Sequence, residues 1–269
     1  MNDIHFNIDI TDIEEDNSIQ KSKYTNISQL YAYCIFDATQ NKKDLSILPE
    51  HVRQYLYEHF DSYKQFQYKV KDRKELMDII MSSKPTADLN CLDISNITSL
   101  SHIFCFDERL WTLFNCNISK WDVSNVTSLN SAFAHLKAFT GDISEWDVSN
   151  VEDMDYLFWK SDFNGDISKW NTSNVKNMGS MFNESKFNND ISEWDVSKVT
   201  NMDGIFYDSI FNKDISKWNI SNVSRFISAF SKSKFNQDIS CWNISKKTTR
   251  IENMFFDSIV EEKYKPHIN

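Results

Sequence analysis

A column of acidic residues is the first feature of this sequence that could do chemistry. Its members stand four positions before each of six regularly spaced tryptophans and are acidic except for the first: Asn117, Asp142, Asp166, Asp190, Asp214 and Asp238. Carboxylate oxygens are ligands that Ca²⁺ accepts, but the same oxygens also accept hydrogen bonds from nearby backbone N–H groups in Asx turns. The Gly-Gly-x-Gly-x-Asp pattern of calcium-binding repeats is absent. The sequence therefore favours Asx turns over a bound cation and predicts no metal site.

Two further columns of charged residues flank the tryptophans and form the candidate partner-binding surface. The residues before the tryptophans are Lys120, Glu145, Lys169, Glu193 and Lys217, and those after them are Asp122, Asp147, Asn171, Asp195 and Asn219. The alternating sign of the first column suits ion pairs between neighbouring repeats, and it also suits a stripe that binds a charged partner. Both interpretations remain open, and Trp111, on an adjoining loop, is included in the candidate surface.

The residues that usually carry catalysis are scattered. The six histidines stand singly, the five cysteines include no C-x-x-C pair, and no glycine-rich loop could hold a phosphate. The net charge of −10 and the pI near 5.1 disfavour nucleic acid, whose binding depends on clustered Lys and Arg. We expect a protein that is not an enzyme, uses no cofactor and binds another protein.

The element that positions these columns is an internal repeat. Six tryptophans recur at spacings of 25, 24, 24, 24 and 24 residues, and their neighbours recur with them. The expected core column comprises Trp121, Trp146, Trp170, Trp194, Trp218 and Trp242, with Phe133, Phe158, Phe182, Phe206 and Phe230. A fixed period in the twenties is typical of a solenoid, in which equivalent side chains of stacked coils form columns.

Each repeat combines two apolar periods. The alternation x-Trp-x-Val-x predicts a short strand buried on one face, and the four-residue spacing of Met178 and Phe182 predicts one helical turn. With only 4 Gly and 3 Pro in 269 residues, the corners must be formed by Asn, Asp and Ser. We predict an α/β solenoid: a leucine-rich-repeat-like stack of about seven coils, each a short parallel strand plus a short helical turn.

The rest of the chain is expected to cap this stack. Residues 1–20 are acidic and predicted to be flexible, residues 21–86 to form a helical cap, residues 87–258 the solenoid and residues 259–269 a C-terminal tail. Within the cap, helices are predicted at residues 30–36, at 49–60 with Pro49 in the first turn, and at 72–81 with Asp72 as N-cap.

The repeat motif Asp-Ile-Ser-x-Trp-Asp-Val-Ser-Asn-Val-x-x-Met-x-x-x-Phe, over about residues 88–256, resembles the BspA-like bacterial surface-protein repeat. That resemblance implies a leucine-rich-repeat-like solenoid used in adhesion or other protein binding, without catalysis. Members of that family are commonly exported, whereas the first residues here show no basic region, no apolar stretch and no lipobox cysteine. We expect a cytoplasmic protein, or a surface-exposed one if an export signal lies upstream.

Two classes of function follow from these expectations. The preferred one is a non-enzymatic scaffold for protein–protein interaction, monomeric rather than oligomeric. The alternatives are a structural element that self-associates and an intracellular inhibitor or immunity-like binding protein. Neither alternative involves catalysis. We expect no membrane insertion either, since no run of 18 consecutive apolar residues occurs.

The acidic column yields the first testable prediction. Because Asx turns need no metal, the melting temperature should be the same in millimolar Ca²⁺ and in excess chelator, measured by circular dichroism. A rise in melting temperature with Ca²⁺ would instead assign the column to a cation.

Overall fold

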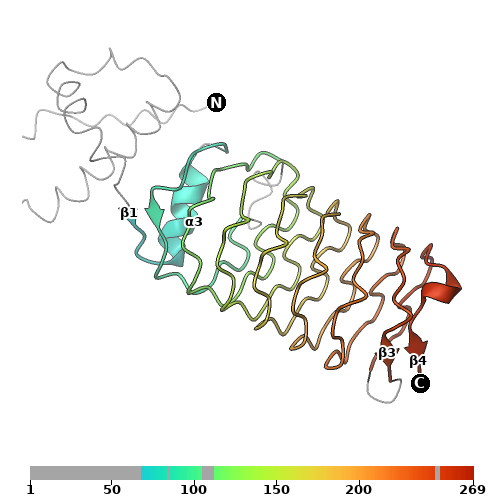
Figure 1. The fold of residues 1–269 in the computed structure, drawn as a ribbon. Coiled ribbons are helices and arrows are strands. Elements are labelled where there is room, and N and C mark those ends of the chain that lie inside the picture. The colour runs from blue at the N-terminus through green and yellow to red at the C-terminus, as the bar shows by residue number, and fades with distance from the viewer. Residues whose placement is uncertain (1–67, 84, 105–111, 246–248) are drawn as a thin grey trace, which may run out of the picture. The chain divides into compact units, whose positions relative to one another are not determined.

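The computed structural model describes residues 68–83, 85–104, 112–245 and 249–269 (Figure 1). The chain divides into a unit of residues Met1–Phe66 and a unit of residues Gln67–Asn269, and all described residues belong to the second. The helices predicted at residues 30–36 and 49–60, and the loop with Trp111, lie outside the described residues. The described part holds no helix long and apolar enough to cross a membrane.

The described chain opens with a strand and a helix. Strand β1 (Tyr68–Lys69) pairs in parallel with β2 (Leu92–Asp93), and helix α3 (Arg73–Ser82) follows β1. The side chain of Asp72 accepts the N–H of Glu75 at 2.9 Å, so Asp72 is the N-cap that the sequence predicts. Leu76 and Ile80 are buried, so the apolar face of α3 contributes to the core.

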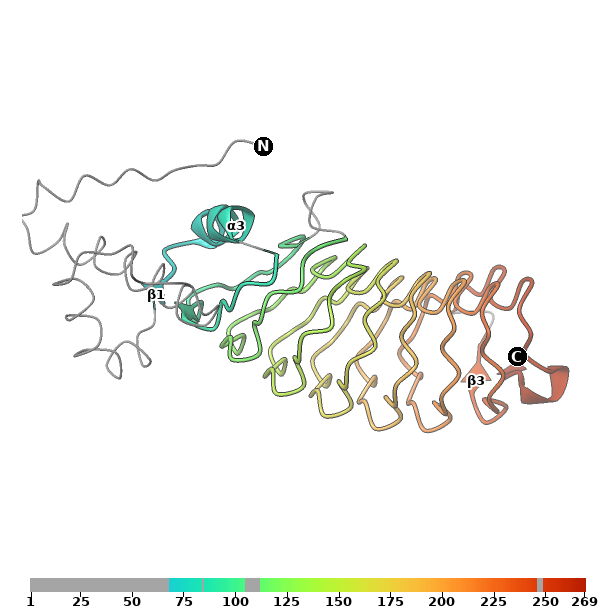
Figure 2. The same cartoon turned by 90° about the horizontal axis from the view of Figure 1, so that it is seen from above.

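Successive coils of about 24 residues then stack side by side, as Figures 1 and 2 show. The contacts between neighbouring coils include a series of isolated parallel bridges: Ser99 to Ser128, Ser128 to Asp153, Asp153 to Asn177, Asn177 to Asn201, Asn201 to Arg225 and Arg225 to Arg250. These bridges lie seven residues after each tryptophan in most coils. At the Trp-x-Val segment, where the sequence suggested a strand, the described residues pair through the backbone in the first and last coils, as β2 and β3 (Asn243–Ile244). We call this series the bridge column.

The backbone alternates its hydrogen bonds beyond each bridge. In the coil after Trp121, the N–H groups of Leu129, Ser131 and Phe133 donate to carbonyls of the next coil at 2.8–3.0 Å. Of the N–H groups between them, that of Ala132 donates to the carbonyl of Leu129 and that of Asn130 donates to Oγ of Ser128, both within the same coil. Each N–H in this stretch therefore has a partner, half of them binding the coil to its neighbour.

This alternation requires left-handed backbone at two positions in each coil. Twelve non-glycine residues in the described ranges have φ between 49° and 64°. They are His102, Ser131, His135, Tyr156, Lys160, Ser180, Glu184, Asp208, Ser228, Lys232, Asn253 and Asp257. The Met-to-Phe segment is therefore a pair of tight turns, where the sequence suggested one helical turn. A left-handed residue reverses the direction of the N–H, which a continuous helix does not allow.

In the coils between the first and the last, the Trp-x-Val segment is joined to its neighbours by side chains. The indole Nε1 of Trp170 donates to the carbonyl of Ile143 in the preceding coil at 3.0 Å, and four other tryptophans make the same bond. Asn150 likewise donates its Nδ2 to the carbonyl of Ser124 at 2.7 Å. The six tryptophans are only 3–4% exposed, and the rings of Trp170 and Trp194 are nearly parallel with centroids 6.4 Å apart.

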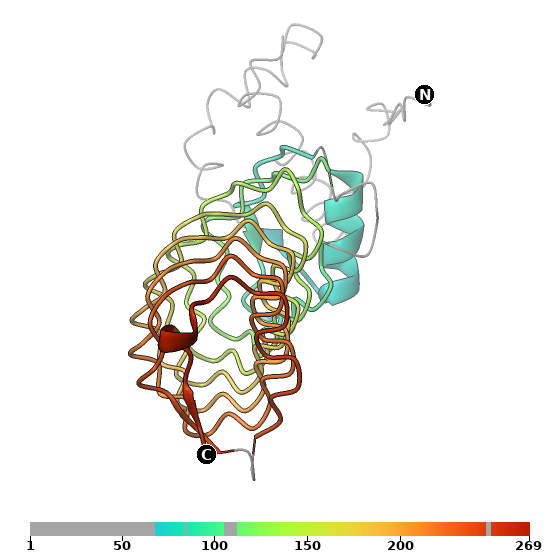
Figure 3. The same cartoon turned by 90° about the vertical axis from the view of Figure 1, so that its right-hand side faces the viewer.

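Phenylalanine rings complete the interior, which Figure 3 views along the stack. The rings of Phe158, Phe182 and Phe206 stack at 5.7–5.8 Å between neighbours. A second column is formed by Phe163, Phe187, Phe211 and Phe235, all fully buried. The core is therefore a set of parallel aromatic columns whose repeat distance is the spacing of the coils.

The pairing extends past residue 258. Strand β3 (Asn243–Ile244) pairs in parallel with β4 (His267–Ile268), which follows the 3₁₀ helix η3 (Glu262–Tyr264). Val260 is buried at the end of the Phe235 column, and Pro266 is buried beside Trp242. The segment that the sequence suggested as a tail thus adds a further rung, because its apolar residues cover the last coil.

The indole bonds generate a prediction with an internal control. Trp170→Phe removes the indole bond to Ile143, whose carbonyl then keeps only the N–H of Trp146 at 3.3 Å, and this loss costs about 1 kcal/mol beyond the lost ring volume. The Nε1 of Trp242 is buried without a partner among the described residues, so Trp242→Phe loses ring volume but no hydrogen bond. Urea unfolding should show the larger loss for Trp170→Phe, and equal losses would contradict the role of the indole bond.

Candidate functional site

The structure assigns the acidic column to Asx turns. The carboxylates of Asp142, Asp166, Asp190, Asp214 and Asp238 each accept the N–H of the serine two residues later at 2.8–2.9 Å. The hydrogen bonds from Ser144 lower the pKa of Asp142. No group of three His, Cys, Asp or Glu residues in the described ranges is arranged to hold a metal ion.

The column that follows the tryptophans makes the same kind of turn. Asp147 accepts the N–H of Ser149 at 3.0 Å, Asp195 accepts that of Ser197 at 2.9 Å, and Asp122, Asn171 and Asn219 do likewise. The hydrogen bonds from the serine hold the pKa of Asp147 and of Asp195 below the usual value. These candidate binding residues are thus already occupied in shaping the coil.

The column that precedes the tryptophans forms ion pairs between coils. Lys169 lies 3.7 Å from Glu145, and Lys217 lies 2.5 Å from Glu193. All four side chains are more than two-thirds exposed, so each pair stabilises the stack by no more than about 1 kcal/mol. Lys120 belongs to the same column, and Trp111 lies outside the described residues.

A different pair of columns occupies the hydrogen-bonded face. Two residues after each member of the bridge column stands a second outward position: Ser101, Asn130, Asp155, Gly179, Asp203, Ile227 and Glu252. The residue between the two, Met178 in the central coil, is buried. We call the bridge column and this second column together the strand face. The candidate binding residues chosen from the sequence do not include any of its members.

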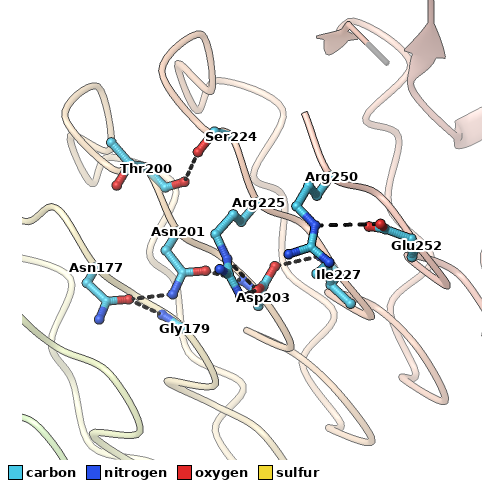
Figure 4. A network of polar contacts seen from close by, with 10 residues as sticks. All are labelled: Asn177, Gly179, Thr200, Asn201, Asp203, Ser224, Arg225, Ile227, Arg250 and Glu252. Carbon is cyan, nitrogen blue, oxygen red and sulfur yellow. Dashed lines mark hydrogen bonds and ion pairs between the residues drawn. The ribbon is translucent and has the colours of Figure 1, made fainter. Parts of the chain in front are cut away.

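Hydrogen bonds run along the strand face from coil to coil. Ser128 and Asn130 donate to Oδ2 of Asp153 at 3.3 and 3.4 Å. Asn177 donates its Nδ2 to Oδ1 of Asp153 at 3.0 Å, and Asn201 donates to Oδ1 of Asn177 at 2.8 Å (Figure 4). These side chains are held in fixed positions without being fully buried, which suits a preorganised surface.

The second half of the strand face carries cations. Arg225 donates through Nε and Nη2 to Oδ2 of Asp203, the Nε distance being 2.6 Å, and Asp203 also accepts the N–H of Ile227 at 2.7 Å (Figure 4). Arg250 lies 3.5 Å from Glu252. The face therefore changes from hydroxyls through carboxylates and amides to guanidinium groups along the stack.

Gly179 has a specific role at the centre of this face. A Cβ at this position would lie 2.6 Å from Oδ1 of Asp155 and 2.7 Å from Nδ2 of Asn201. The two polar side chains therefore fold over the glycine backbone, which a larger residue would prevent. Burial, followed by the charge of Asp153, raises the pKa of Asp155 to about 6, and Arg225 only partly opposes this.

The strand face escaped the sequence analysis for a physical reason. Recurring residue types mark the core and the Asx turns, whereas the bridge column varies from Ser through Asp and Asn to Arg. The sequence signal that could have identified the strand face is this variation at the two positions that flank an always apolar residue. Only the hydrogen-bonding pattern shows that these two positions face outward at the bridges.

The raised pKa of Asp155 yields a pH prediction. Since the folded pKa is about 6 and the unfolded value 3.8, the folded state binds the proton more tightly, and stability falls as the pH rises between these values. Asp155→Asn should abolish this fall and stabilise the protein at pH 7 by about 1–2 kcal/mol, allowing for solvent screening of a half-exposed group.

Urea unfolding of both proteins from pH 4 to pH 7 checks this prediction. Asp195→Asn is the control of opposite sign. Because the pKa of Asp195 is lowered in the folded state, its contribution is lost as the pH falls. Identical pH profiles for the wild type and Asp155→Asn would contradict the assignment.

Comparison with known proteins places the chain in a family. Two overlapping segments, residues 74–186 and 160–265, match the family model described as "Mycoplasma protein of unknown function, DUF285". No curated protein and no solved structure matches the chain. Together the two segments cover more than half of the 269 residues, and their overlap agrees with the internal repeat. The chain therefore belongs to this family of repeat proteins.

Proposed function

We propose that this protein is a non-enzymatic scaffold that binds another protein through its strand face. In this proposal the stacked coils are a leucine-rich-repeat-like solenoid related to BspA-like repeats. The binding surface is centred on Asp153, Asp155, Asn177, Asn201 and Arg225. In this proposal the chemistry of that surface selects the partner, and no catalysis is involved.

The contrast between constant core and variable face is the observation that carries the proposal. In the first five coils that contain a core tryptophan, the residue twelve positions after that tryptophan is always phenylalanine. Over the same coils, the bridge column changes in charge and size. Side chains that only hold the stack together have no reason to vary in this way. A rigid frame with variable, outward, ordered side chains is typical of recognition surfaces built on repeats.

The charge of the chain supports a protein partner over a nucleic acid. The formal net charge is −10, and on the strand face Arg225 and Arg250 lie beside Asp203 and Glu252. Paired guanidinium groups are poorly placed to neutralise phosphates. They remain suited to the mixed polar contacts that surround protein interfaces.

The columns beside the tryptophans are a second candidate surface. Glu145, Lys169, Glu193 and Lys217 are exposed and ordered by ion pairs, and a charged partner would have to break or bridge those pairs. Because the neighbouring aspartates already serve Asx turns, we propose this surface as secondary to the strand face. The following experiment separates the two.

Affinity capture from the native cell, followed by titration of the recovered protein, tests the proposal. The double variant Asp153→Ala/Arg225→Ala should weaken binding by at least about tenfold, since charged groups at an interface centre each contribute more than about 1 kcal/mol. The matched variant Glu145→Ala/Glu193→Ala should bind within about twofold of the wild type.

Loss of binding only in the second variant would move the interface to the tryptophan-flanking columns. Binding unaffected by either variant would contradict both surfaces. Sedimentation of the purified chain distinguishes the alternative of a self-associating structural element, for which a concentration-dependent increase in mass is required.

A further inference from the structure

A corner of the stack beside the strand face gathers surface aromatic rings. The position that follows the core phenylalanines holds Ala134, Trp159, Asn183, Tyr207, Ser231 and Phe256, and we call it the corner column. Its central members lie on consecutive coils, because Lys160 donates its N–H to the carbonyl of Asn183 at 2.8 Å and Glu184 donates to Tyr207 at 2.7 Å. Trp159, Asn183 and Tyr207 are therefore aligned on three adjacent coils.

Trp159 is the centre of an aromatic cluster at the surface. Its ring meets His135 at 4.5 Å and Tyr156 at 5.3 Å between centroids, both in edge-to-face geometry. The ammonium of Lys160 lies 5.0 Å from the ring centroid. Tyr156 is 38% exposed, and Trp159 is half-buried. This tryptophan belongs to no core column, so stacking of the coils does not require it.

Tyr207 supplies a second ring two coils away. Neighbouring strands lie about 4.8 Å apart, so the Trp159 and Tyr207 backbones are separated by about 10 Å. The ammonium of Lys232 lies 5.5 Å from the Tyr207 centroid. Each ring is therefore covered by the ammonium group of a flexible lysine, and a ligand can displace that side chain at low free-energy cost.

The residue between the two rings has an unused hydrogen-bond acceptor. Oδ1 of Asn183 is buried and has no partner among the described residues, while its Nδ2 donates weakly to Ser180 at 3.4 Å. Gly204, at φ +58°, leaves the adjoining position without a side chain. An unpartnered carbonyl costs about 1–3 kcal/mol, so a ligand donor that reaches this oxygen would be stabilised here.

The charges around the rings nearly balance. Lys160 pairs with Glu184 at 3.5 Å, and Lys232 stands between Asp208 and Asp257 in the same column. A corner with two lysines and three carboxylates carries little net charge, so it selects weakly between ions of either sign. It does offer donors and acceptors together with two ring faces, which matches a neutral ligand that has both C–H faces and hydroxyl groups.

We propose that the corner formed by Tyr156, Trp159, Asn183 and Tyr207 binds a neutral oligosaccharide. Sugar rings stack on Trp159 and Tyr207, and a hydroxyl of the intervening sugar donates to Oδ1 of Asn183. This site uses none of the strand-face residues, and together with the proposed function it gives the protein one surface for a glycan and another for a protein partner.

Calorimetric titration of the full chain with three soluble hexasaccharides tests the proposal. The probes are β-1,4-linked glucose, β-1,4-linked N-acetylglucosamine and α-1,4-linked glucose. At least one should bind, and Trp159→Ala and Tyr207→Ala should each weaken that binding by about tenfold, the upper range for one aromatic contact. Asn183→Ala should weaken it as well, and Trp159→Phe should retain most of the affinity because it keeps a ring.

Phe256→Ala is the matched control, since this residue occupies the same column, is 62% exposed and lies two coils beyond Tyr207. It should leave the affinity unchanged within about twofold. Absence of binding to all three probes overturns the proposal, and so does binding that the corner variants do not change. If the protein partner is lost on Trp159→Ala while no hexasaccharide binds, the corner belongs to the protein interface instead.

Discussion

The structure depends on one constraint, which is that backbone N–H groups past each bridge donate alternately to the next coil and to their own coil. This division satisfies every N–H from Leu129 to Leu136 and leaves no helix or extended strand within those turns. It requires a left-handed residue twice per coil, which the chain accepts at non-glycine positions such as Tyr156 and Lys160. The cost of such backbone, of order 1 kcal/mol each, is tolerable only because neighbouring coils enforce it. A single coil would lose the hydrogen bonds to its neighbours and the contacts that stabilise its left-handed residues.

The same constraint separates the residues that build the stack from those that are free to vary. Where the backbone does not bond between coils, side chains do so: the indole of Trp170, the amide of Asn150 and the hydroxyl of Thr172, which donates to Asp195 of the next coil at 3.0 Å. The tryptophan and asparagine positions repeat in most coils because they make the same bond, whereas Thr172 stands where the other copies have Val or Ile. At the bridges the backbone joins neighbouring coils, so the outward side chains of the strand face are not needed to join them. Variation is thus concentrated where the backbone does most of the joining.

Much of the core was predictable from the sequence, and the faces were not. The buried tryptophan and phenylalanine columns follow from periodicity, and helix α3 follows from Asp72, Glu75 and the apolar residues after them. The position of the bridges was not predictable in this way, because Trp-x-Val alternates like a strand yet is joined through side chains. The residues at 259–269 looked polar, but Val260 and Pro266 are placed to cover the last coil. Asp155 gave no sign of its raised pKa, which arises from burial beside Asp153 over the bare backbone of Gly179.

The sequence by itself determined the repeat, its period, the interior side chains and the Asx turns, because each of these depends on residues close together in the chain or on a spacing that can be counted. The tertiary structure alone decided which polar columns share a face, that Asp153, Asn177 and Asn201 join in one network, and that Trp159 and Tyr207 flank Asn183. Residues 24 apart become neighbours only when coils stack, and the direction of their side chains is set by left-handed turns that no local pattern of apolar residues encodes.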